Sequence, residues 1–76
     1  MNKARRAKIE QLKTELETLK DQIDAIKDEE EEYLDNIPEN LQSSERYEIA
    51  ENAVGALEDA ITSLEETIVS LETAAE

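Results

Sequence analysis

Two runs of apolar residues with alternating spacings of three and four constrain the fold of this chain more than any other feature. The first run consists of Ile9, Leu12, Leu16, Leu19, Ile23 and Ile26, and the second of Val54, Leu57, Ile61, Leu64, Ile68 and Leu71. This spacing places each run on one narrow stripe of a long helix. Because such a stripe stays dry only when another helix covers it, the two runs predict a coiled coil.

The runs are separated by a segment that predicts a turn. Pro38 disfavours a helical conformation at the residue before it and removes a backbone donor. Ser44 is the expected N-cap of the second helix. We therefore predict one domain over residues 1–76, with a first helix over 3–35, a turn over 36–44 and a second helix over 45–74.

A turn of about nine residues permits antiparallel neighbours and is too short for parallel ones. The predicted fold class is therefore all-α, an antiparallel two-helix coiled-coil hairpin. With Ile9 at heptad position a, lysines occupy the e positions of the first helix and glutamates those of the second. We expect the e positions to face each other, with Lys13 beside Glu65, Lys20 beside Glu58 and Lys27 beside Glu51.

A second stripe on the 45–74 helix is made of small residues at positions g and c. Its members are Ala53, Ala56, Ala60, Ser63, Thr67, Ser70 and Ala74. Small side chains let another helix approach closely, so these residues are the candidate interface of a homodimer that forms a four-helix bundle. The alternative is an ordinary solvent-facing surface.

Composition argues against catalysis and against several kinds of partner. The chain has no Cys and no His, so the usual neutral-pH general base and the commonest transition-metal ligand are missing. We predict no enzymatic activity and no catalytic, cofactor-binding or metal-ligating residues. The acidic run Asp28–Glu32 wraps more than one helical turn, which favours a solvated surface over a cation site.

The net charge of −13 opposes global attraction to nucleic acid or to anionic lipid, and makes a basic protein partner conceivable. No apolar run approaches the roughly 18–20 residues that span a bilayer, and the default expectation is a soluble cytoplasmic protein. The basic segment over residues 3–8 has two interpretations: a nucleic-acid-binding arm, or a helix end whose charges neutralise acidic neighbours. The second interpretation is favoured because no aromatic residue is interleaved.

Apolar and aromatic residues also gather at the turn, inside an acidic collar. These are Tyr33, Ile37, Leu41 and Tyr47. They are the candidate docking surface for a partner, and the alternative is a hydrophobic plug that closes the end of the hairpin.

The segment from Tyr33 to Glu48, YLDNIPENLQSSERYE, resembles a pattern found in small uncharacterised proteins of bacteria and their phages. The resemblance extends over residues 29–61. It implies a helical hairpin of unassigned function and assigns no functional residues.

The predicted function is that of a non-catalytic structural or protein-interaction module that self-associates through helical stripes. The alternative is an acidic mimic of nucleic acid that inhibits a basic DNA- or RNA-binding protein.

Overall fold

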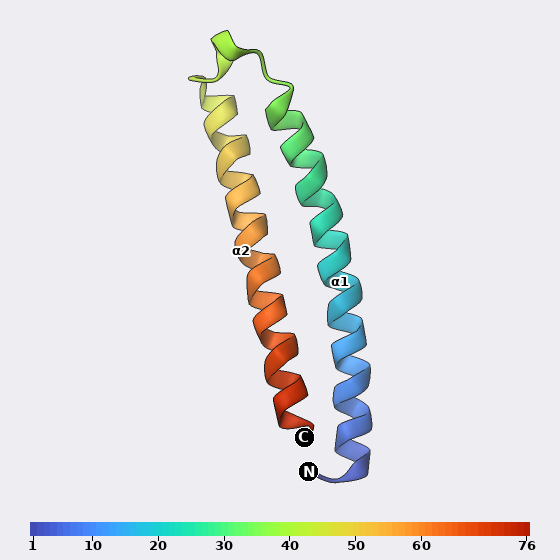
Figure 1. Cartoon of the computed structure of the whole chain (residues 1–76). Helices are drawn as coiled ribbons and strands as arrows, with labels where there is room; N and C mark the ends of the chain where they lie inside the picture. Colours follow the sequence, from blue (N-terminus) through green and yellow to red (C-terminus); the bar gives the residue numbers. More distant parts are fainter.

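The computed structural model describes residues 1–76 as two long helices joined by a short turn, with no strand. The elements are α1 (Lys3–Asp35), the 3₁₀ helix η1 (Glu39–Leu41) and α2 (Glu45–Ala74). The predicted all-helical hairpin is confirmed, and the helix bounds coincide with the predicted ranges. Figure 1 shows α1 and α2 side by side in opposite directions, with both termini at the end of the rod away from the turn. The Cα atoms extend over 59 × 15 × 12 Å.

Side-chain caps begin both helices. The Ser44 hydroxyl accepts a hydrogen bond from the backbone N–H of Tyr47 at 3.3 Å, and the Asn2 side chain accepts one from the N–H of Arg5 at 2.8 Å. Glu45 and Glu48 lie in the first turn of α2, where negative charge complements the exposed N–H groups. These contacts satisfy donors that a helix start leaves unpaired.

The turn is held together by backbone hydrogen bonds. The N–H of Asn36 donates to the carbonyl of Glu32 at 3.1 Å and closes the last turn of α1. Pro38 then takes an extended conformation, with φ −56° and ψ 145°, and the N–H of Leu41 donates back to its carbonyl at 2.8 Å. Pro38 therefore marks the point where the chain leaves α1 and reverses.

The core of the hairpin is thin because each helix is covered on one side only. The most buried residues are Ala50, Val54 and Ile68, all on α2. Both a and d positions of α2 lie against α1, together with Ala53 and Ala60 at position g. On α1 the half-buried residues occupy positions a and e. Position a contributes Ile9, Leu16 and Ile23, and position e contributes Lys13, Lys20 and Lys27.

The expectation that the d positions of α1 complete the core is wrong. These residues are substantially exposed: Leu12 at 38%, Leu19 at 50%, Ile26 at 54% and Tyr33 at 44%. α1 is turned about its own axis so that the e lysines lie over α2 instead. A lysine stem can cover apolar surface while its ammonium group stays in water, which makes this orientation favourable for a hairpin with no other cover.

Candidate interaction surface

An uncovered strip of large apolar side chains runs along one edge of α1. We call it the apolar strip, and it consists of Leu12, Leu19, Ile26 and Tyr33. Its members recur every seventh residue over roughly 30 Å of helix. Single exposed apolar residues are common on protein surfaces, but an aligned row of them is typical of an interaction site.

The predicted interface residues of α2 lie beside this strip. We call them the small stripe: Ala53, Ala56, Ala60, Ser63, Thr67, Ser70 and Ala74. The Lys13–Glu72 ion pair shows that the e positions of both helices lie on the same side of the hairpin, because both residues occupy position e. Positions d of α1 and g of α2 lie on the opposite side of the helix–helix contact. The apolar strip and the small stripe therefore share one face, which combines large and small residues.

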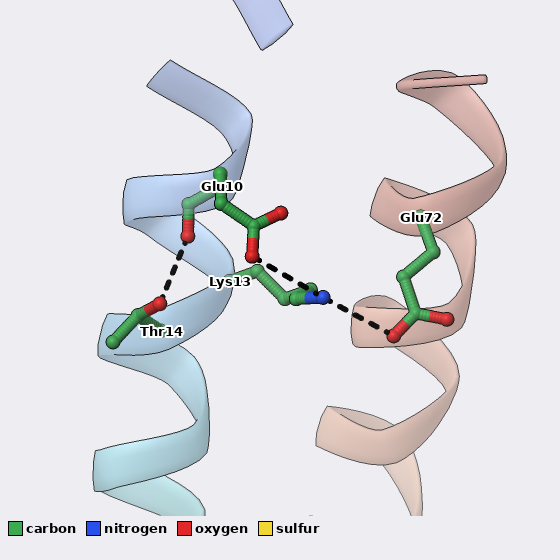
Figure 2. A network of polar contacts seen from close by, with 4 residues as sticks. All are labelled: Glu10, Lys13, Thr14 and Glu72. Carbon is green, nitrogen blue, oxygen red and sulfur yellow. Dashed lines mark hydrogen bonds and ion pairs between the residues drawn. The ribbon is translucent and has the colours of Figure 1, made fainter. Parts of the chain in front are cut away.

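The opposite side of the hairpin carries the ion pair that joins the two helices, which Lys13 forms. Figure 2 shows the Lys13 ammonium group between the carboxylates of Glu10 and Glu72, each at 3.5 Å. The Thr14 hydroxyl donates to the backbone carbonyl of Glu10 at 3.1 Å. Partial burial lowers the pKa of Lys13, but attraction to Glu10 and Glu72 outweighs this effect and the net pKa is raised.

The prediction that Lys13 pairs with Glu65 is wrong, since its partner on α2 is Glu72. Every Cα–Cβ bond in a helix tilts toward that helix's N-terminus. In an antiparallel pair, the side chains of Lys13 and Glu72 therefore lean toward each other, whereas Glu65 leans away from Lys13. The same rule matches Lys20 with Glu65, and these two side chains line one shallow groove.

The prediction that Lys27 pairs with Glu51 is also wrong. Its ammonium group binds carboxylates of its own helix, Asp24 at 3.6 Å, Asp28 at 3.9 Å and Glu31 at 3.9 Å. Attraction to Glu31 is the largest effect on Lys27 and raises its pKa. Asp24 and two members of the acidic run lie within about one turn of Lys27, so the lysine need not reach across to α2.

The turn end contains a hollow of about 420 Å³. It is lined by Tyr33, Asn36, Ile37, Pro38, Leu41, Ser44 and Arg46. Of the four predicted docking residues, Tyr33, Ile37 and Leu41 meet there, while Tyr47 lies outside the lining and is half-buried. Leu41 is 49% exposed, so the cluster does not close the end of the hairpin completely.

The remaining chemistry of the surface is sparse. No three carboxylates converge in an arrangement that could hold a metal ion. Neither helix is long and apolar enough to cross a membrane. The basic residues of segment 3–8 are exposed and form no ion pair within the chain.

Sequence reasoning named the small stripe as a candidate interface and did not predict the apolar strip. Leu12, Leu19 and Ile26 belong to the run that was expected in the helix–helix contact, because a and d positions are the usual contact positions of a coiled coil, and Tyr33 was expected at the turn. The available signal was the combination of lysines at every e position from Lys13 to Lys27 with alanines at g positions of α2. The aliphatic part of a lysine at position e of α1 can replace a d residue in the contact with α2. Small residues at position g of α2 make room for α1 in this orientation.

Comparisons with protein-family models, with characterised proteins and with solved structures found no match to this chain. The resemblance of the Tyr33–Glu48 segment to small bacterial and phage proteins stays a prediction. The functional argument depends on the surface itself.

Proposed function

We propose that the chain is a non-catalytic self-association module, in which two copies pack face to face as a four-helix bundle. One observation carries the proposal: the half-exposed apolar strip of α1 lies on the same face as the small stripe of α2, whose members are exposed except for the half-buried Ala53 and Ala60. A second copy provides what the isolated hairpin lacks, a second apolar contact along its whole length. Burial of half-exposed leucine, isoleucine and tyrosine side chains supplies the driving force.

The small stripe allows the close approach that such packing requires. Ala56 and Ala60 project no side chain beyond Cβ, so a facing helix can come near the backbone of α2. Interaxial distances depend on the side chains at the contact and are shortest where these are small. The polar side, with Lys13 and its carboxylates, would remain in solvent.

Sedimentation equilibrium tests this interface. The double substitution Ala56→Glu with Ser63→Glu places two carboxylates at exposed positions of the small stripe, and we expect it to convert the dimer to a monomer. The matched control is Thr62→Glu with Val69→Glu, which adds the same charge at exposed b positions on the other side of α2. An unchanged mass for the Ala56/Ser63 variant would remove this interface.

A second candidate function is an acidic mimic of nucleic acid that occupies a basic protein surface. The observation that favours it is the row of exposed, unpaired carboxylates at Glu51, Glu58 and Glu65. Binding to such a partner should weaken steeply as salt rises and should displace the partner's nucleic acid in a gel-shift assay. Substitution of these three residues by Gln should weaken the inhibition, and equal inhibition by this variant would reject the candidate.

A further inference from the structure

Charge is distributed unevenly along the rod. Segment 3–8 carries four exposed basic side chains, those of Lys3, Arg5, Arg6 and Lys8. No carboxylate of the chain lies within ion-pair distance of these side chains. The opposite end, at the turn in Figure 1, carries the run Asp28–Glu32 and then Asp35, Glu39 and Glu45. The end with the termini also carries Glu72 and Glu76, which offset part of this basic charge, yet it remains far less acidic than the turn end.

We infer that two copies pack with reversed long axes, so that segment 3–8 of each copy lies beside the acidic turn end of the other. This inference rests on the proposed self-association. Two hairpins can meet on one face around a two-fold axis in two ways. An axis along the rod places both acidic turns at the same end, where they repel. An axis across the rod pairs each basic end with an acidic end and stacks α1 on α1 and α2 on α2.

The spacing of the face fits the reversed arrangement. Across a two-fold axis, residues at equal distances on either side of the axis face each other, so the spacing of each stripe must be symmetric about the axis. The apolar strip is symmetric about the midpoint between Leu19 and Ile26, which places Leu12 of one copy opposite Tyr33 of the other. Within the small stripe, Ala53, Ala56, Ala60 and Ser63 are symmetric about residue 58, which places Ala56 opposite Ala60. Thr67, Ser70 and Ala74 have no counterpart in the stripe about this centre.

These two centres lie at the same height in the hairpin. Residue 22 is about thirteen residues before the end of α1 at Asp35, and residue 58 is about thirteen residues after the start of α2 at Glu45. One axis can therefore serve both stripes. The same axis brings Lys8 of one copy level with Ile37 of the other, and Arg6 level with Glu39.

Spin labels on introduced cysteines measure the orientation directly, because the chain has no cysteine of its own. Ala7 and Asp21 both occupy the outward f position of α1 and are exposed, so labels at Ala7→Cys and Asp21→Cys avoid the interface. In the reversed dimer the two Ala7 labels are separated along the rod by roughly 45 Å, while the two Asp21 labels are nearly level. Pulsed electron paramagnetic resonance should therefore give a distance for Ala7→Cys that is longer by roughly 20 Å or more.

Other outcomes separate the two proposals. Similar distances for the Ala7 and Asp21 labels would overturn the reversed orientation and leave self-association in place. Absence of any dipolar signal from either label would overturn self-association, and the inference with it.

Charge reversal gives an independent test of the contact between ends. Arg5→Glu with Arg6→Glu should raise the dimer dissociation constant about tenfold at low salt, because each substitution acts at both ends of the dimer. Adding Asp35→Lys and Glu39→Lys to this variant should restore tight association. If the spin-label experiment shows a dimer but the dissociation constant of the Arg5→Glu, Arg6→Glu variant is unchanged, the proposed contact between the ends is contradicted.

Discussion

At the scale of single residues, the e-position lysines of α1 combine packing with electrostatics. The side chains of Lys13 and Lys27 are 21% and 20% exposed, and both have raised pKa values because carboxylates surround their ammonium groups. Lys20 occupies the equivalent position and has no carboxylate within ion-pair distance. The three lysines therefore allow the ion-pair contribution to be separated from that of the covering stem.

The ion pairs of Lys13 predict a loss of stability at alkaline pH. A raised pKa in the folded state means that the contribution is fully present below the ordinary lysine pKa of about 10.4 and is lost as pH rises through the raised value. Lys13→Met should have a lower melting temperature than the wild type at pH 8, and this difference should shrink above pH of about 10.5. Lys20→Met is the control, because it removes a similar side chain that forms no ion pair. A difference for Lys13→Met that stays constant with pH would contradict the role of the ion pairs.

Gly55 offers a gain in stability that does not involve any contact. It lies inside α2, and a Cβ placed there would meet no atom within 4 Å. Gly55→Ala should raise the free energy of unfolding by about 0.5–1 kcal/mol, because alanine loses less backbone entropy on helix formation. Denaturation in urea measures this change. Ala25→Gly, at an exposed position of α1, should lower the free energy by a similar amount, and a destabilised Gly55→Ala variant would contradict the account.

At the scale of elements, the ends of the helices were predictable because local chemistry determines them. Pro38 stops α1 and Ser44 caps α2, and neither effect depends on the rest of the molecule. The rotation of α1 was not predictable in this way. Leu12 and Lys13 are neighbours that compete for the same contact, and the outcome depends on the room left by Ala53 and Ala60 on the other helix.

The turn gives a prediction that separates its two interpretations. Leu41 is half exposed in η1, so Leu41→Ser should lower the free energy of unfolding by about 1 kcal/mol or less. Thermal unfolding followed by circular dichroism measures the loss, with Gln42→Ser as a control that removes no apolar surface. A small loss of stability favours a docking surface around the hollow, whereas a loss of about 3 kcal/mol would show that Leu41 acts as a plug.

At the scale of the whole molecule, the hairpin carries its interhelical ion pair on one side and the apolar strip on the other. Periodicity in the sequence predicted two helices in contact and named the small stripe as a candidate interface. It could not predict that the strip from Leu12 to Tyr33 would lie open beside that stripe, because heptad positions say which residues share a face and not how far each face turns toward its neighbour. The open face is thus a property of the packing rather than of either helix alone.

Sedimentation equilibrium of the unmodified chain tests the central claim most directly. If the face formed by the apolar strip and the small stripe is an interface between copies, the mass should rise with protein concentration from that of the 8.6 kDa chain to twice that value. A mass of one chain over the whole concentration range would contradict the account.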